Sequence, residues 1–157
     1  MPLNAKQKGD PLSPDFKLEN SPFYAMNRAI GFYDREMTRM LKAVGVDIPR
    51  WRVLMLAHER GPISVSEIAE FAMMKQSTTT RVIQRMCRDK LITVEARATD
   101  ARVTEVALTP AGDKAVDRIR QAASKVYGKA FRDFQPKEVA LALDLLRRIK
   151  NGLQEPI

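Results

Sequence analysis

The sequence predicts a mainly α-helical protein with one small β-hairpin. Apolar residues recur every three to four positions over most of the chain, and prolines or glycines separate the stretches that do so. Only residues 91–108 are rich in β-branched residues and partly alternate, as strands do. The 157 residues are 45% hydrophobic and 29% charged, which suits one globular domain with a helical extension.

The chain before residue 60 is expected to form an arm followed by two helices. Residues 1–20 hold three prolines among polar residues, which indicates a flexible arm, and they lack the apolar segment of a signal peptide. Apolar residues at helical spacing predict a helix over 22–44. Asp47 and Pro49 suit the start of a second helix, which continues to about Glu59.

Two short helices joined by a tight turn are expected next. Ser64 and Glu67 have the spacing of a capping box, so a helix should begin at Ser64. The stretch "MKQSTTTRVIQRM" (74–86) has apolar residues at helical spacing behind a run of hydroxyl residues, and its helix should end at about Arg88. Two such helices, the second with Ser, Thr, Gln and Arg near its start, are typical of a helix-turn-helix.

The segment after this pair predicts a wing. "LITVEA" (91–96) and "RVTEVAL" (102–108) are expected to be two strands, because both are rich in β-branched residues. Between them "RATDA" forms a polar tip with basic character. A hairpin in this position beside a helix-turn-helix is interpreted as a wing.

The outer helices are expected to form a dimer interface. Thr109 suits the N-cap of a long helix that ends at the "FQP" break, and a last helix is predicted from about Pro136 to Asn151, with Gly152 as its stop. These helices and the first one cannot all bury their apolar stripes on a small winged unit, so packing against a second copy is the simplest solution. The predicted organisation is an arm at 1–20, a dimerisation helix at 21–46, a winged helix-turn-helix domain at 47–109, and C-terminal dimerisation helices at 110–157.

Charge and the rare residue types limit the function classes. The formal net charge of +8 favours a polyanionic partner, nucleic acid before a membrane surface, and no apolar run reaches the roughly 18 residues that span a bilayer. Because Cys87 and His58 are single, no internal disulfide and no dense metal-ligand cluster are expected. The sequence contains no catalytic triad, phosphate loop or metal motif, so we expect a cytoplasmic protein that is not an enzyme and has no cofactor.

Two stretches carry a family resemblance: "SVSEIAEFAMMKQSTTTRVIQRMCRDKLI" (64–92) and "TDARVTEVALTPAG" (99–112). Together with the flanking helices in this order, they resemble the MarR (multiple antibiotic resistance regulator) family of bacterial transcription factors. The resemblance implies a dimeric winged helix-turn-helix repressor, sometimes an activator, that binds a near-palindromic operator and is often released by a small aromatic ligand. Lys90 departs from the pattern, since the family usually has glycine there.

The predicted DNA contacts lie at the start of the second helix of the pair and on the wing. A helix N-terminus favours a nearby phosphate, and long Gln and Arg side chains reach base edges. Gln76, Ser77, Thr79 and Arg81 are expected to face the groove, with Lys75, Thr78 and Arg85 near the DNA backbone. The resemblance implies that Arg102 enters or borders the minor groove and that Asp100 holds it. The full predicted set is Ser64, Lys75, Gln76, Ser77, Thr78, Thr79, Arg81, Arg85, Arg97, Asp100 and Arg102.

Two other interpretations of these residues stay open. The polar helix face and the wing tip are also what a merely solvated surface looks like, where an ion pair contributes little. A winged helix can also bind another protein without touching DNA. Salt-sensitive, sequence-preferring DNA binding distinguishes the first interpretation from both.

The resemblance places an effector pocket where the dimer helices meet the winged unit. Tyr24, Arg28 and Phe32 share one helix face at four-residue spacing, and Trp51 and Met55 do the same on the next helix. Aromatic rings with an arginine suit an aromatic carboxylate or its coenzyme A thioester, and the alternative is that the rings form the core of the junction.

Cys87 lies near the end of the second helix of the pair. A small residue packed against the core is expected there rather than a redox switch.

Overall fold

The computed structural model describes residues 5–156 and confirms the mainly α-helical fold class. The helices are α1 (Ala5–Lys8), the 3-10 helix η1 (Leu18–Asn20), α2 (Pro22–Lys42), α3 (Ile48–Arg60), α4 (Val65–Phe71), α5 (Gln76–Arg88), α6 (Pro110–Ala130) and α7 (Pro136–Gln154). The strands are β1 (Ile63–Ser64), β2 (Ile92–Arg97) and β3 (Asp100–Leu108). Residues 5–20 of the predicted arm contain α1 and η1, whereas residues 1–4 of that arm lie outside the described residues.

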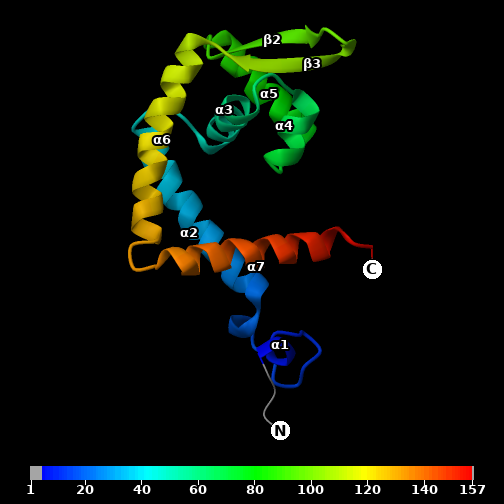
Figure 1. Ribbon diagram of the computed structural model, residues 1–157, viewed down its shortest axis with the longest axis vertical. Helices are drawn as coiled ribbons and strands as arrows, with labels where there is room; N and C mark the ends of the chain where they lie inside the picture. The colour runs from blue at the N-terminus through cyan, green and yellow to red at the C-terminus, as the bar shows by residue number, and fades with distance from the viewer. Residues whose placement is uncertain (1–4, 157) are drawn as a thin grey trace.

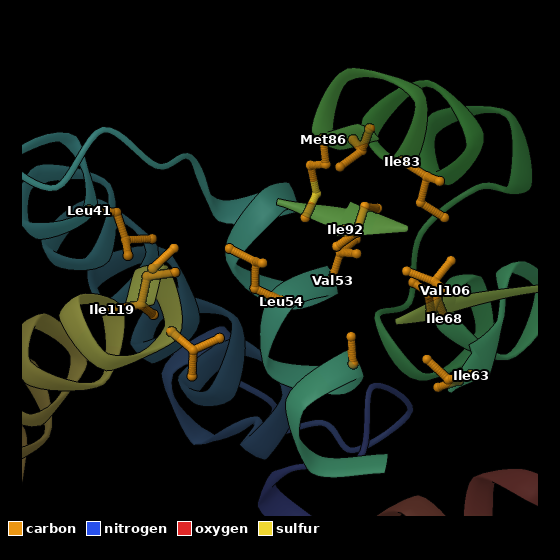
Figure 2. Close-up of a cluster of buried hydrophobic side chains, with 14 of the residues drawn as sticks. Leu41, Val53, Leu54, Ile63, Ile68, Ile83, Met86, Ile92, Val106 and Ile119 are labelled. Atoms are coloured by element: carbon orange, nitrogen blue, oxygen red, sulfur yellow. The ribbon is translucent and has the colours of Figure 1, made fainter. Parts of the chain in front are cut away.

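One hydrophobic core joins the winged unit to the helix pair α2–α6. Leu54 of α3 is fully buried at its centre, between Met86 of α5 on one side and Leu41 and Ile119 of the helix pair on the other (Figure 2). Each large side chain buried in this way contributes about 1.5–3 kcal/mol. Because α5 packs on this core through Val82, Ile83 and Met86, the core fixes which face of α5 remains exposed.

The predicted helix starts are confirmed. The Asp47 side chain accepts a hydrogen bond from the backbone N–H three residues further on, at 2.9 Å, and so caps α3. The capping box is complete: the Ser64 hydroxyl accepts from the Glu67 N–H at 3.1 Å, and the Glu67 carboxylate accepts from the Ser64 N–H at 3.0 Å. Thr109 caps α6 in the same manner. These caps satisfy backbone donors that a helix start otherwise leaves without partners.

The sheet has a third strand that the sequence did not predict. The strand order is β1-β3-β2, and both pairings are antiparallel. The strand β1 pairs with β3 only through Ile63 with Val106 and Ser64 with Glu105. Two residues are too few to produce an alternating pattern, so a sequence analysis cannot detect such a strand. Between Glu105 and its tip, the hairpin is a two-stranded ribbon of β2 and β3 that projects at the upper end of the molecule (Figure 1).

The end of α5, the base of the hairpin and the start of α6 meet in one junction. The Leu91 N–H donates to the Met86 carbonyl at 3.0 Å, which closes α5 with a Schellman motif around Lys90 at φ 57°. A lysine in this left-handed conformation costs about 1 kcal/mol relative to glycine. The Thr109 hydroxyl in turn donates to the Lys90 carbonyl at 2.7 Å.

Gly112, in the first turn of α6, packs directly on this junction. A Cβ at Gly112 would overlap the Leu91 carbonyl oxygen and lie 3.2 Å from the Leu108 side chain. Only glycine fits here, because the carbonyl belongs to backbone that the Schellman motif already holds in place.

The helix α7 and large parts of α2 expose apolar side chains. The helix α7 has no buried residue, and in Figure 1 it projects away from the lower end of α6. The large exposed apolar side chains of the helical extensions are Phe23, Ile30, Phe32 and Tyr33 on α2, Tyr127 on α6, and Leu141, Leu143, Leu145, Leu146 and Leu153 on α7.

Two predicted helix ends were wrong. The helix α6 ends at Ala130, before the expected break, and the turn that follows packs the Phe131 ring against Tyr127 in a tilted contact and against Phe134 edge to face. The helix α7 continues through Gly152 to Gln154 and ends where Pro156 forces the preceding residue into an extended conformation.

Within residues 5–156, none of the helices is both long and apolar enough to cross a membrane.

Candidate nucleic-acid interface

The first turns of α5 accommodate their threonines through hydrogen bonds to the helix itself. The Thr79 hydroxyl donates to the Lys75 carbonyl at 3.1 Å, and the Thr80 hydroxyl donates to the Gln76 carbonyl at 3.0 Å. Such back-bonding lets a β-branched hydroxyl residue occupy a helix position with its polar group satisfied. The unusual composition of this segment therefore does not prevent it from being helical from Gln76 onward.

The two faces of α5 differ sharply. Its buried residues are Thr79, Val82, Ile83 and Met86. With 3.6 residues per turn, the residues that point away from this face are Ser77, Arg81, Gln84 and Arg88, and all four are exposed. The outward face therefore presents one hydroxyl, one amide and two guanidinium groups, which are donors suited to phosphates and to base edges.

The structure corrects two of the predicted contacts. Thr79 is fully buried against the core, so its side chain does not face a groove. Ser64 is also buried, and its hydroxyl takes part in the capping box of α4, which makes its role structural. The other predicted residues of α5 and its N-cap, Lys75, Gln76, Ser77, Thr78, Arg81 and Arg85, are exposed.

Gln84 and Arg88 were missed by the sequence analysis. Gln84 lies seven residues after Ser77 and Arg88 seven after Arg81, so they continue the same helix face by two turns. The buried positions Val82, Ile83 and Met86 set the phase of the helix, and this signal was present in the sequence. Their exposure on the outward face adds one more cation and one more amide to the candidate interface.

Ion pairs anchor the C-terminal end of α5 to the start of α3. Arg50 Nη2 lies 2.8 Å from Asp89 Oδ2, and the Arg50 side chain is only 19% exposed. Arg85 Nη1 lies 3.8 Å from Asp47 Oδ2. Arg85, which was predicted to lie near the DNA backbone, therefore faces α3 and forms an ion pair with a carboxylate there. The C-terminal end of α5 is thus tied to the start of α3.

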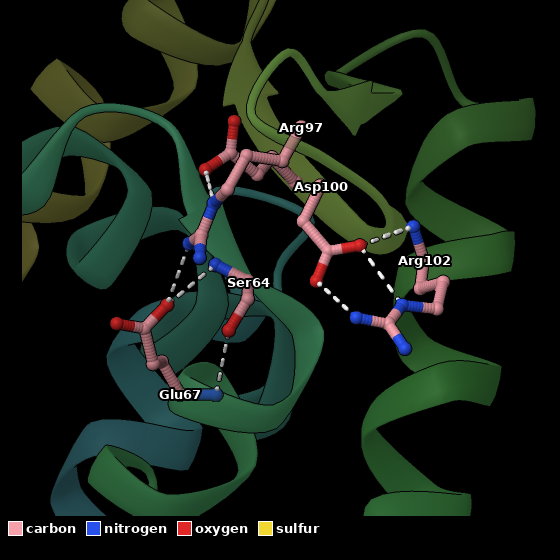
Figure 3. A network of polar contacts seen from close by, with 6 residues as sticks. Ser64, Glu67, Arg97, Asp100 and Arg102 are labelled. Carbon is pink, nitrogen blue, oxygen red and sulfur yellow. Dashed lines mark hydrogen bonds and ion pairs between the residues drawn. The ribbon is translucent and has the colours of Figure 1, made fainter.

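The wing presents Arg102 in a defined orientation. The Asp100 carboxylate accepts hydrogen bonds from Arg102 Nε at 3.1 Å and Nη2 at 3.3 Å, and from the Arg102 backbone N–H at 3.1 Å (Figure 3). These hydrogen bonds hold the pKa of the Asp100 carboxyl below its usual range. Because the Arg102 side chain is 91% exposed, the pair orients the guanidinium while leaving it accessible.

Arg97 is arranged differently from Arg102. Its Nε donates to Glu105 Oε1 at 2.6 Å, and its Nη2 lies 3.5 Å from Glu67 Oε2 on α4 (Figure 3). The hydrogen bond with Glu105 raises the pKa of Arg97 above its ordinary value. Its guanidinium therefore points back toward the body of the winged unit rather than away from the wing.

A groove of about 900 Å³ lies between α5 and the wing. Its walls include Gln76, Thr80, Gln84 and Arg88 on α5 and Arg102 and Thr104 on the wing. The α5 residues follow one another at four-residue spacing along a helix edge, and apolar side chains of Val65, Ile83, Val94 and Val103 line the rest of the groove. Cys87 also borders the groove, and burial raises the pKa of its thiol, which disfavours the reactive thiolate.

The five predicted effector residues do not line one common cleft within the chain. Tyr24, Arg28 and Phe32 border a shallow pocket of about 350 Å³ on α2, where the Arg28 guanidinium lies 5.4 Å from the Phe32 ring centroid. Trp51 instead packs 6.1 Å from the Tyr33 ring, and Met55 packs against the main core. Tyr33 follows Phe32 on α2 and therefore points about 100° away from it, which separates the two groups.

The described residues contain no group of three or more His, Cys, Asp or Glu side chains arranged to hold a metal ion. His58 faces Asp113 at 3.9 Å, and both side chains are largely exposed.

Three similarities to known proteins agree with this arrangement. The model of the MarR family matches residues 46–104, which contain the helix-turn-helix and most of the wing. The HTH-type transcriptional repressor IacR of Pseudomonas putida is 34% identical over 145 residues, covering 92% of this chain and 87% of that protein. A crystal structure of a MarR-family regulator from Silicibacter pomeroyi matches with a TM-score of 0.80 at 25% identity, covering 89% of this chain and 94% of that one.

A further solved structure of similar fold contains a bound ligand. CouR from Rhodococcus jostii RHA1, solved in complex with p-coumaroyl-CoA, matches with a TM-score of 0.79 and covers 90% of this chain and 98% of that one. Its sequence is 18% identical, so this similarity is one of fold.

Proposed function

The chain belongs to the MarR family of transcriptional regulators, and from this premise we propose that it is a ligand-responsive repressor that binds a near-palindromic operator as a homodimer. Its relatives are transcriptional regulators and not enzymes. The proposed site of action is the bacterial cytoplasm, where the DNA lies.

The observation that carries DNA binding is the pairing of two donor surfaces across one groove. The outward face of α5 supplies Ser77, Arg81, Gln84 and Arg88, of which Gln84 and Arg88 line the groove, and the wing supplies an oriented Arg102 on its other side. A helix of this kind fits the major groove, and a wing arginine suits the negative potential of the adjacent minor groove. We propose these five residues as the main contacts, with Lys75, Gln76 and Thr78 beside them and Arg85 at the edge.

Dimerisation is supported by the apolar surface that the single chain leaves uncovered. On α7, four leucines are each about half exposed and Leu153 is more exposed still. Monomeric proteins rarely expose large apolar patches. In the proposed dimer, α2, α6 and α7 pack against their counterparts around a twofold axis. The two α5 helices then enter successive major grooves about 34–36 Å apart.

Substitution of Arg102 tests the DNA contact. Arg102→Ala is expected to weaken binding to a duplex from upstream of the protein's own gene by about tenfold and to reduce the salt slope by about one unit, because one phosphate-proximal charge is lost. Fluorescence anisotropy across a range of salt concentrations measures both quantities.

Arg132→Ala is the matched control, since it removes an exposed arginine at the distant α6–α7 turn. Equal affinities and slopes for the two variants would contradict the wing contact. If the wild-type protein itself shows no salt-sensitive, sequence-preferring binding, a winged-helix module that binds another protein becomes the better interpretation.

The proposed effector is an aromatic carboxylate or its coenzyme A thioester. Arg28 lies between the Tyr24 and Phe32 rings, 6.0 and 5.4 Å from their centroids, which combines a carboxylate partner with stacking surfaces. The complex of CouR with p-coumaroyl-CoA supports a ligand of this class. In a dimer, the partner's helices would cover this otherwise shallow pocket.

Loss of the effector response in one variant tests this proposal. One member of a panel of aromatic carboxylates and their coenzyme A thioesters is expected to lower operator affinity about 5- to 150-fold, the usual range of allosteric coupling. Arg28→Ala should abolish that response while keeping operator binding, and Lys42→Ala, on the same helix outside the pocket, should retain the response. A full response in Arg28→Ala would exclude this pocket.

A further inference from the structure

We propose that Arg97 is a positioning residue: it braces the wing against the start of α4 and thereby sets where Arg102 lies relative to α5. The inference rests on the proposed DNA-binding function for its consequence. The contacts of Arg97 from which it is argued lie within the protein itself and do not involve DNA.

The wing needs such a brace because little else holds its outer part. The strand β1 supports β3 only as far as the pair Ser64–Glu105, and the remainder is a two-stranded ribbon with a register shift between Ala96 and Arg97. Two-stranded ribbons are at best marginally stable in water. The orientation of Arg102 therefore depends on contacts between this ribbon and the helices beneath it.

The partner of Arg97 on α4 is held in place before the contact forms. The same Glu67 oxygen that faces Arg97 at 3.5 Å also accepts the Ser64 N–H at 3.0 Å (Figure 3). These hydrogen bonds with Ser64 hold the pKa of the Glu67 carboxyl below its usual range, so it stays ionised. The capping box thus serves a second purpose: it fixes an anionic anchor for the wing.

Arg97 also offsets a repulsion inside the sheet. Glu105 stands directly opposite Glu95 in the β2–β3 ladder, and like charges at opposed positions are destabilising. The Arg97 guanidinium lies between Glu105 and Glu67, forms an ion pair with each, and compensates one of their two negative charges. Without Arg97, Glu105 would stand opposite Glu95 without a cation beside it, and the wing would lose its ion pair with α4.

Glu67→Gln distinguishes this brace from simple electrostatics. Glutamine keeps the capping box, since both residue types serve at that position, but removes the charge that faces Arg97. Removing an anion near bound DNA ordinarily tightens binding. The brace predicts the opposite: operator affinity should fall about two- to fivefold. Glu70→Gln, the same change at an exposed position of the same helix, should leave affinity unchanged or slightly higher.

Arg97→Gln completes the experiment. It should weaken operator binding by a similar factor without changing the salt slope, and the Arg97→Gln, Glu67→Gln double variant should lose no more than either single variant. In the free proteins, both single variants should accelerate amide hydrogen exchange at residues 96–104, while exchange in α3 stays unchanged.

The possible outcomes separate cleanly. A salt slope that falls by about one unit in Arg97→Gln identifies a direct phosphate contact and overturns the brace, as does tighter binding by Glu67→Gln. Unchanged exchange in the wing overturns it as well. Because exchange is measured without DNA, failure of the wild type to bind an operator refutes the proposed function and leaves the brace separately tested.

Discussion

Gly112→Ala is expected to lower the free energy of unfolding by about 3 kcal/mol, among the larger effects available to a single methyl group. The added Cβ would overlap the Leu91 carbonyl oxygen, and that carbonyl accepts the Thr109 N–H at 3.1 Å. Neither side can yield easily, because the first turn of α6 and the Schellman motif of α5 are both hydrogen-bonded backbone. For a protein of this length, the change corresponds to a melting temperature about 10 °C lower.

Gly128→Ala provides a control of opposite sign. Gly128 lies in the same helix, and a Cβ there would meet no atom within 4 Å. Alanine in a helix interior is favoured over glycine by roughly 1 kcal/mol, so this variant should be more stable than the wild type. Urea denaturation followed by circular dichroism measures both. Stability of Gly112→Ala within 1 kcal/mol of the wild type would show that the junction is looser than its geometry indicates.

Leu146→Glu is expected to separate the proposed dimer and to weaken operator binding by about 100-fold or more. Leu146 lies near the middle of the apolar stripe of α7, and its side chain is 48% exposed in the single chain, so the fold of one chain does not depend on it. Burying a carboxylate in an apolar interface without a partner is strongly unfavourable. Two linked recognition helices bind far more tightly than one, which is why loss of the dimer affects DNA binding so strongly.

Ala140→Glu tests whether position matters rather than charge. It introduces the same side chain on the opposite, polar face of α7. Sedimentation analysis should find a species of one chain, 17.8 kDa, for Leu146→Glu and a species of two chains for Ala140→Glu. A dimer that survives Leu146→Glu would mean that the stripe of α7 faces something other than its counterpart.

Local signals explain why much of the fold was predictable. The N-caps at Asp47, Ser64 and Thr109 are short-range patterns in which one side chain satisfies nearby backbone donors. Such patterns mark helix starts irrespective of the rest of the chain. Helix ends were less predictable, because the end of α6 depends on aromatic packing in the following turn.

The candidate interface was predictable in kind but less so in its members. Thr79 suited either a core or a groove by its chemistry, and only its position three residues before Val82 and four before Ile83 placed it on the buried face. The pairing of Arg97 with Glu67 joins residues thirty positions apart. It depends on how β1 and α4 fold against the wing, which no local pattern encodes.

The junction at Lys90, Leu91 and Thr109 joins the start of α6 directly to the end of α5 by hydrogen bonds. Thr109, the residue just before α6, donates its hydroxyl to the carbonyl of Lys90, which lies just past the end of α5. Because these hydrogen bonds join the two helices, a rotation of α6 moves the end of α5 with it. In the proposed dimer, a change in how the two copies pack along α6 would therefore change the separation of the two α5 helices directly.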